Sequence, residues 1–245
     1  MVAGTKPARK ALARTANAPA RAVNQGGERT RVRILDAAEQ LFSEHGLDGV
    51  SMRQITARAK APLALANYHF KSKEGLYRAA LERRIVAVSA ERRAALARAS
   101  KERRGPATIE AVLEALARPW VELRSRPGGL AYTRLLAREA GDPAEGRRGI
   151  IGELLDPIAR EFIVAMERAL PGMPRQRVNW AYHFFIGALL IILANPDRVV
   201  RLSGRRCDVA SDRAVIHEIV TFFSAALAAP AGLTNKPATT ARSKK

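Results

Sequence analysis

Polar, aromatic and basic side chains gather between residues 67 and 73, and their types suit the recognition of a charged polymer. Asn67, Tyr68 and His69 are adjacent, and Lys71 and Lys73 follow shortly after them. An asparagine amide can bond to the edge of an adenine base, whereas tyrosine and lysine side chains bind phosphate oxygens. We therefore expect nucleic-acid contact here, in which the basic groups position the chain and the amide reads the base.

Three further side chains are expected to share this contact surface. Arg53 could reach a guanine or a phosphate, whereas Leu63 and Ala64 can only meet a thymine methyl group. His69 has two interpretations, because a lone histidine is commonly held by a structural hydrogen bond but could also contact phosphate. The predicted DNA-contacting residues are Arg53, Leu63, Ala64, Asn67, Tyr68, His69, Lys71 and Lys73.

Two short helices joined by a tight turn are predicted to hold these side chains. Ser51 can accept a hydrogen bond from the backbone N–H of Gln54, whose side chain can reach back to the Ser51 backbone. The first helix should end near Ala59, because Pro62 disfavours α geometry at Ala61. Pro62 then suits the first position of the second helix, where its missing N–H costs nothing.

Flanking helices are predicted to support this pair. Apolar residues recur on one face of a helix over about 30–45, and Gly46 supplies the left-handed residue that ends it. Ala66 and Phe70 should face the core, which leaves Asn67 and Tyr68 outward. Ser72 should cap a further helix that runs to about residue 100. The apolar face of the first helix comprises Ile34, Leu35, Ala38, Leu41 and Phe42.

In order and spacing, residues from about 30 to 81 resemble the DNA-binding domain of the TetR family of one-component transcriptional repressors. The resemblance rests on the helix over 31–45, on Gly46, on the Ser51 cap and on the run Asn67-Tyr68-His69-Phe70-Lys71-Ser72-Lys73-Glu74-Gly75-Leu76. The chain departs from the family pattern at Lys60, where the family usually has Gly, and at Pro62, where Ser or Thr is common. The resemblance implies a three-helix helix-turn-helix DNA-binding domain over 29–75.

The larger C-terminal part is also predicted to be helical. Apolar patterning between Pro and Gly breaks places helices near 108–125, 130–139, 150–170, 174–194 and 212–228. The expected fold is therefore all-α, and the resemblance implies that residues 76–230 form a ligand-binding and dimerisation bundle. In the family the last two long helices pair across a twofold axis; an ordinary monomer core is the alternative. The predicted dimer residues are Trp180, Phe184, Gly187, Ala188, Ile191, Phe222, Phe223 and Leu227.

The resemblance also implies a small-molecule site within this bundle. Its effector should be mostly apolar, with His183 or Arg138 as a polar anchor. Each candidate could instead be an ordinary core residue. The predicted ligand-binding residues are Trp120, Tyr132, Arg138, Phe162, Met166, Trp180 and His183, and Leu136, Tyr182 and Phe185 are further candidates.

Positive charge is concentrated in the first part of the chain. The 245 residues carry a net charge of +19, and residues 1–104 hold 22 Lys or Arg but only nine acidic residues. A polyanionic partner would explain this, because basic groups that neutralise phosphates release counterions; an Arg-rich proteome is the alternative. Residues 1–28 and 231–245 lack apolar periodicity and are predicted to be disordered basic arms, which either contact a DNA groove or are merely solvated.

Signals for catalysis, metal binding or membrane insertion are weak. His183 and His217 lack a thiol or a second histidine at metal-binding spacing, and no Gly-rich phosphate loop follows a strand. The single cysteine, Cys207, excludes an internal disulfide and fits a reducing compartment. The longest apolar run, over 184–194, is too short to span a bilayer, and no signal peptide is evident. We expect no enzyme activity, cofactor or metal, and a cytoplasmic location on the bacterial nucleoid.

Together these patterns predict a homodimeric, ligand-responsive transcriptional regulator. It is expected to be a repressor that a small apolar effector releases from a palindromic double-stranded DNA operator. The alternative is an architectural DNA-binding protein that senses no ligand and makes sequence-neutral contacts with its basic arms. Competition with random duplex separates the two, because only the regulator should prefer its own site by a factor on the order of 10³.

Overall fold

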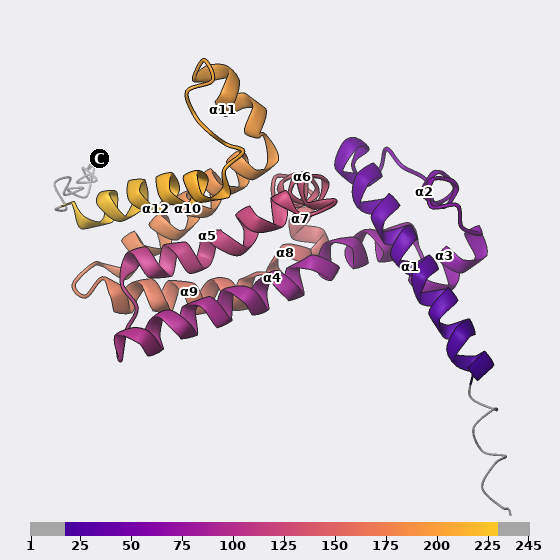
Figure 1. Cartoon of the computed structure of the whole chain (residues 1–245), viewed down its shortest axis with the longest axis horizontal. Helices are drawn as coiled ribbons and strands as arrows, with labels where there is room; N and C mark the ends of the chain where they lie inside the picture. Colours follow the sequence, from indigo (N-terminus) through magenta and orange to yellow (C-terminus); the bar gives the residue numbers. More distant parts are fainter. Residues whose placement is uncertain (1–17, 230–245) are drawn as a thin grey trace, which may run out of the picture. The chain divides into compact units, whose positions relative to one another are not determined.

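The computed structural model describes residues 18–229, with side chains from residue 26 onward, and these residues form twelve α-helices and no β-strand (Figure 1). The all-α prediction is confirmed. Residues 1–17 and 230–245, which make up much of both predicted arms, lie outside the described residues. The helices are α1 (Ala18–His45), α2 (Met52–Arg58), α3 (Leu63–Phe70), α4 (Lys73–Arg103), α5 (Ile109–Ser125), α6 (Gly129–Ala140), α7 (Glu145–Arg148), α8 (Ile150–Leu154), α9 (Asp156–Ala169), α10 (Arg175–Ala194), α11 (Pro196–Leu202) and α12 (Asp212–Ala228).

Helix α1 extends further toward the N-terminus than expected. Residues 18–28, predicted to belong to a disordered arm, are helical. Thr30 Oγ donates a hydrogen bond to the Gly26 carbonyl at 3.0 Å, and Arg31 pairs with Glu28 at 3.3 Å. These contacts between residues three and four apart continue the helix backward from its buried part. Gly46, with a φ of +76°, ends α1 as predicted.

Most other predicted helices have counterparts at similar positions. Those predicted over 108–125, 130–139, 174–194 and 212–228 correspond to α5, α6, α10 and α12. The helix predicted over 150–170 is instead divided into α8 and α9. Pro157 lies in the first turn of α9, and it cannot donate the backbone hydrogen bond that a continuous helix would need there.

Packing divides the chain into two compact units. Among the described residues, the first comprises 18–87 together with 126–154, and the second comprises 88–125 together with 155–229. The first therefore contains α1–α3, the start of α4, and α6–α8, and the second contains the rest of α4, α5 and α9–α12. This grouping differs from the domain boundary expected between residues 75 and 76, because α6 packs against α1.

Two buried carboxylates tie the helices of the first unit together. Arg84 donates to both carboxylate oxygens of Glu39 at 2.8–3.1 Å. Glu139 accepts a hydrogen bond from the Tyr77 hydroxyl at 2.8 Å and two from Arg148 at 2.7 and 3.0 Å. Removing one partner of such a buried pair typically costs about 3–5 kcal/mol. The two clusters join α1, α4, α6 and α7, which explains why this unit includes segments far apart in sequence.

In the second unit, α5 packs among three other helices. It packs against α9, α10 and α12, and its buried side chains include Val112, Leu113, Leu116 and Trp120. The short helix α11 stands out from α10 and α12 together with the loop that follows it (Figure 1). Neither α11 nor the four-residue α7 was among the predicted helices.

Helix α10 is long and apolar enough to cross a membrane by length and composition alone, contrary to the expectation that no segment qualifies. Only 39% of its most apolar 18-residue window is buried. Core helices of soluble proteins pass the same test, and the buried face of α10 packs against α5, α9 and α12.

Candidate nucleic-acid interface

The start of α2 has the hydrogen bonds that its sequence predicts. The Ser51 backbone N–H donates to Gln54 Oε1 at 2.8 Å, and the Gln54 backbone N–H donates to Ser51 Oγ at 3.3 Å. This capping box satisfies two N–H groups that would otherwise be free at the helix end, and such a cap typically contributes about 1 kcal/mol. The capping prediction is confirmed, and α2 is fixed at its entry.

The turn between α2 and α3 is held by backbone hydrogen bonds and by one left-handed residue. The N–H of Ala61 donates to the Thr56 carbonyl at 3.0 Å. Lys60 has a φ of +49°, a conformation that costs a residue with a side chain about 1–2 kcal/mol. This is the position where the family usually has glycine. Pro62, with ψ of 138°, precedes α3 as its N-cap, so the prediction that it is the first helical residue is wrong by one position.

Helix α3 presents one face to the core and the other to solvent. Ala66 and Phe70 are buried in the first unit, as predicted, together with Ile55 of α2. Asn67 and Tyr68 are exposed, and the Tyr68 side chain retains 70% of its accessible surface. The alternation places the buried pair four residues apart on one face, and it leaves the amide and the phenol free for a ligand.

The junction of α3 and α4 is sterically tight. Lys71 ends α3 with a φ of +67°, and its Nζ lies 5.6 Å from the centre of the Tyr68 ring. Ser72 Oγ accepts the backbone N–H of Gly75 at 3.0 Å, which confirms the predicted cap of α4. A Cβ at position 75 would lie 2.2 Å from the Phe70 carbonyl oxygen, so only glycine fits without a backbone shift. The basic residues after α3 are therefore held close to its end.

His69 is half-buried beside Tyr68 and Phe70, with ring centres 5.2 and 5.9 Å away. Its Nε2 atom is buried and has no hydrogen-bond partner among the described residues. In this conformation a phosphate contact of His69 could not use Nε2.

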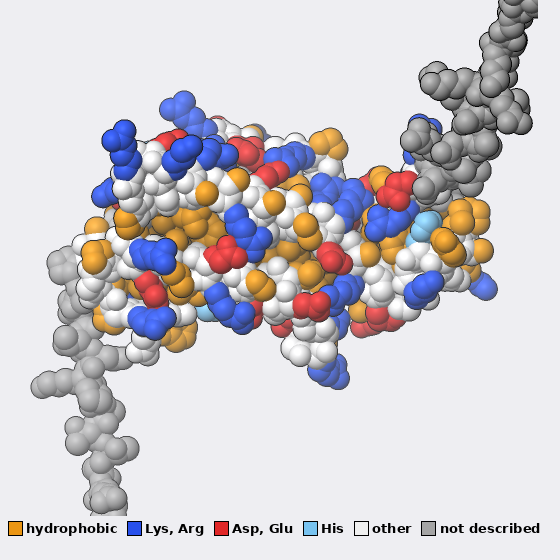
Figure 2. All heavy atoms as spheres, turned by 90° about the horizontal axis from the view of Figure 1, so that it is seen from below, with side chains coloured by type: hydrophobic (Ala, Val, Ile, Leu, Met, Phe, Trp, Pro, Cys, Tyr) orange, Lys and Arg blue, Asp and Glu red, His pale blue; other side chains and the backbone are white. Residues whose placement is uncertain are grey.

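The predicted DNA-contacting residues all lie on α2, α3 or the α3–α4 junction. Arg53, Ala64, Asn67, Tyr68 and Lys71 are exposed, and Leu63, His69 and Lys73 are half-buried. Within the described part of the chain, the three cationic residues of this set form no ion pair. Figure 2 shows more basic than acidic side chains on the face in view. Cations without an acidic partner are available to bind phosphate.

The predicted ligand-binding residues do not come together. Tyr132 is buried in the first unit, where its hydroxyl donates to the Leu81 carbonyl at 2.5 Å. Arg138 is an exposed residue of the same unit, and it donates to the Glu44 carbonyl at 3.3 Å. In the second unit, Trp120, Phe162 and Met166 are buried, whereas Trp180 and His183 are exposed on α10. The burial of Trp120, Tyr132, Phe162 and Met166 fits ordinary core residues as well as it fits the wall of a ligand site.

A polar group inside the second unit was not among the candidates. Arg92 is buried, and its position follows Leu81, Ile85 and Val88 at intervals of four, three and four along α4. Those three residues are also buried, so the helical period alone places Arg92 on the inward face. The signal was present in the sequence, but a charged residue is not expected to occupy a core position.

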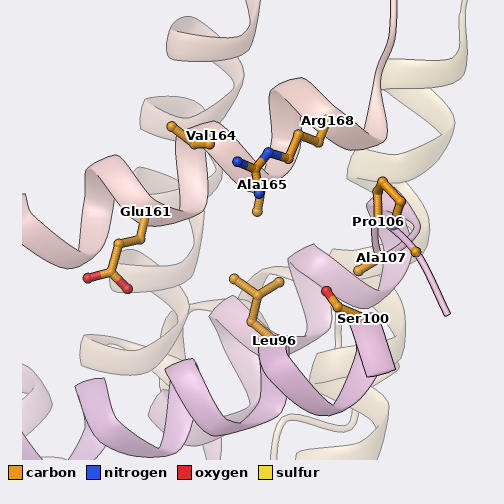
Figure 3. Close-up of a pocket in the computed structure, with 9 residues that line it drawn as sticks. Leu96, Ser100, Pro106, Ala107, Glu161, Val164, Ala165 and Arg168 are labelled. Carbon is orange, nitrogen blue, oxygen red and sulfur yellow. The ribbon is translucent and has the colours of Figure 1, made fainter. Parts of the chain in front are cut away.

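The described residues of the second unit line a groove and a larger hollow. A groove between α4 and α9 has a volume of about 470 Å³ and includes Leu96, Val164, Ala165 and Arg168 in its lining (Figure 3). A hollow of about 740 Å³ lies among α10, α12 and the segment after α11, and Cys207 is part of its wall.

Apolar side chains are exposed on α10 and α12. We define the α10–α12 patch as Trp180, Phe184, Ile191 and Phe222, which are 56–69% exposed. Trp180 and Phe184 stack with ring centres 5.6 Å apart. Leu227, predicted for the same surface, is buried within the chain, and Phe223 is half-buried against Phe185.

Two family models match this sequence. The model of bacterial regulatory proteins of the tetR family matches residues 34–80, and that of the tetracyclin repressor-like C-terminal domain matches residues 114–226. A search of curated proteins finds no match to this chain.

Solved structures share the fold at low sequence identity. The fatty acid degradation regulator FadR from Bacillus halodurans has 16% identity and a TM-score of 0.60, with 79% of this chain and 94% of that chain covered. A TetR-like transcriptional regulator from Rhodococcus sp. RHA1 has 17% identity and a TM-score of 0.54, with coverage of 80% and 96%. These likenesses concern the fold alone.

Proposed function

Because the chain belongs to the TetR family and is a DNA-binding transcriptional regulator, we propose that it is a repressor which a small, mostly apolar effector releases from a palindromic operator. The observation that carries the proposal is that α3 has one buried face and one exposed face. Ala66 and Phe70 fix it to the core, and Asn67 and Tyr68 are left exposed. A helix held in this way can enter a major groove with its polar face toward the bases.

The contacts divide by chemistry into those that read sequence and those that position the protein. Asn67 can bond to an adenine edge, and Leu63 and Ala64 can meet a thymine methyl group. Lys71 and Lys73 would bind phosphates and supply affinity that does not depend on sequence. Arg53 could serve in either role, by bonding to a guanine or to a phosphate.

A homodimer would place two copies of α3 in successive major grooves, roughly 34 Å apart. The α10–α12 patch supports this arrangement, because clustered exposed aromatic side chains on a soluble protein mark an interaction surface. The twofold symmetry of such a dimer matches the palindromic form of the proposed operator.

The effector response would be a shift between two shapes of the dimer. An effector lowers operator affinity only to the extent that it binds better to the shape that fits DNA poorly. A regulator of this kind acts on DNA in the cytoplasm, which is where we place the protein.

The experiment is selection of duplex fragments from the source genome by the full-length protein, followed by competition of the best fragment against random duplex at fixed salt. A preference on the order of 10³ or more supports the regulator. Equal binding of both duplexes would contradict it and favour the architectural alternative.

A further inference from the structure

Arg92 of α4 is a buried cation that lacks an acidic partner. The residue is 2% exposed, and its Nε and Nη2 atoms have no hydrogen-bond partner among the described residues. An unpaired charge in a protein interior is strongly unfavourable, and buried donors are nearly always bonded. A buried cation of this kind therefore suggests that a ligand supplies the missing partner.

The surroundings of Arg92 come from three helices. Its guanidinium lies over the ring of Phe162 of α9, 4.8 Å from the ring centre. The Tyr182 hydroxyl of α10 is its hydrogen-bonding neighbour. Burial lowers the pKa of Arg92, although the guanidinium stays protonated at neutral pH. The side chains of Phe162 and Tyr182 around Arg92 are thus aromatic and carry no negative charge to balance the cation.

The nearest acid, Glu161, is already engaged by another residue. Arg93 donates three hydrogen bonds to the Glu161 carboxylate at 2.7–3.0 Å, on the exposed side of α4. In the first unit, by contrast, each buried carboxylate is matched by an arginine. Arg92 is therefore an exception to the way this chain handles its other buried charges.

A second unsatisfied polar group lies one turn away. Ser89 is 6% exposed, and its Oγ has no hydrogen-bond partner among the described residues. Ser89 and Arg92 are three residues apart on α4 and so share one face of the helix. A hydroxyl and a guanidinium on one face can bind the same anionic group.

The lining of the groove between α4 and α9 begins close to Arg92, at Leu96 on α4 and at Glu161, next to Phe162, on α9. Leu96 follows Arg92 by four residues, and Ala165 follows Phe162 by three. In Figure 3, Leu96 and Ser100 point from α4 toward α9, where Val164 and Ala165 lie opposite them. The volume of about 470 Å³ is in the range of small-molecule sites, and much of the lining is apolar.

We propose that Ser89, Arg92 and Tyr182 bind the anionic head of the effector, and that the effector is an organic monocarboxylate whose apolar body lies along the α4–α9 groove. A carboxylate matches the planar fork of a guanidinium and neutralises its single charge. A phosphate dianion would leave a net charge in the interior. This inference rests on the proposed function only in treating the bound acid as the effector that releases DNA. Binding of the acid depends on the residues of the second unit alone.

The test compares acids with alcohols of the same size. Octanoate against octanol, and phenylacetate against phenylethanol, are titrated into the full-length protein without DNA, by calorimetry and thermal shift. The wild type should bind each acid roughly tenfold or more tightly than its alcohol, as expected for a charge-assisted hydrogen bond. Arg92→Met should lose this preference, and Ser89→Ala should weaken it. The matched control is Arg98→Met, an exposed arginine of the same helix, which should keep it.

Arg92→Met should also unfold at a higher temperature than the wild type when no ligand is present, because an apolar side chain replaces an unpaired charge. If the methionine variant does not fold, Arg92→Lys replaces it in the test. Lysine keeps the positive charge but lacks the planar guanidinium that can bond to both carboxylate oxygens. Failure of both acids to bind the wild type, or an unchanged acid preference in Arg92→Met and Arg92→Lys, would overturn the proposal.

Operator binding is measured separately, so that the two proposals can fail independently. Acids that bind through Arg92 but do not release DNA would support the anion site and contradict the effector response. Release of DNA by the alcohols alone would contradict the anion site and support the response.

Discussion

Replacing Glu139 by Gln should measurably loosen the first unit. The carboxylate is fully buried and accepts hydrogen bonds from Tyr77 and, at both oxygens, from Arg148. Glutamine keeps the size of the side chain but removes the charge. Arg148 retains its contact with Asp142 at 3.0 Å and is partly exposed, so the loss should lie below the full cost of breaking a buried pair. We expect a loss of about 2–3 kcal/mol in the free energy of unfolding.

The assay is thermal unfolding followed by far-UV circular dichroism. For a chain of this size, the expected loss corresponds to a decrease in Tm of about 4–12 °C. Tryptophan fluorescence is a poor choice, because both tryptophans belong to the second unit.

Glu153→Gln is the matched control. It removes an exposed carboxylate that pairs with Arg78 at 2.5 Å, and exposed pairs contribute about 0–1 kcal/mol. If Glu139→Gln lowers Tm no more than Glu153→Gln does, the buried cluster is not what holds α6 in this unit.

Four further substitutions test other parts of the molecule. Asn67→Ala should cost about 1–3 kcal/mol of operator binding and relax preference at one base position; a loss that is uniform over all sequences would refute its reading role. Lys73→Ala should weaken binding to every duplex and flatten the dependence of log affinity on log salt by about one unit. Trp180→Glu should yield monomers in sedimentation, and a dimer as stable as the wild type would exclude the α10–α12 patch as the interface. Burial raises the pKa of Glu39 above 4.5, so the folded chain binds this proton more tightly than the unfolded chain does. The contribution of Glu39 to the free energy of unfolding therefore falls as pH rises from 4.5 to the raised pKa. Glu39→Gln should remove this pH dependence from the free energy of unfolding measured across the same interval.

Features specified by neighbouring residues could be predicted from the sequence. The Ser51–Gln54 capping box and the inward pair Ala66 and Phe70 follow from spacings of three and four residues, and the structure has both. The first helix of the recognition motif ends at Gly46 for a similarly local reason, its positive φ.

Features specified by distant residues could not be predicted in this way. Tyr77 and Glu139 are 62 positions apart, and no local pattern indicates that they bond. The inclusion of α6 in the first unit depends on such contacts. The break before α9 is a different case, since Pro157 was visible in the sequence but a continuous apolar pattern outweighed it.

Candidate ligand-binding residues were the hardest to select from the sequence. Aromatic residues were selected as candidates because pockets are rich in them, yet cores are rich in them too. Trp180 and Phe162 illustrate the two outcomes, one exposed and one buried. Arg92 is more informative, because its buried position is unusual for its residue type.

The separation of roles along α3 and the junction after it indicates how this protein could be retargeted to another DNA sequence. Positions that hold the helix in place cannot vary freely, and Gly75 has no room for even one added carbon. A library for altered specificity should therefore keep Ala66, Phe70 and Gly75 constant and randomise Leu63, Ala64 and Asn67. Folded variants should then be frequent in the library, and their differences should lie in the base pairs that they prefer.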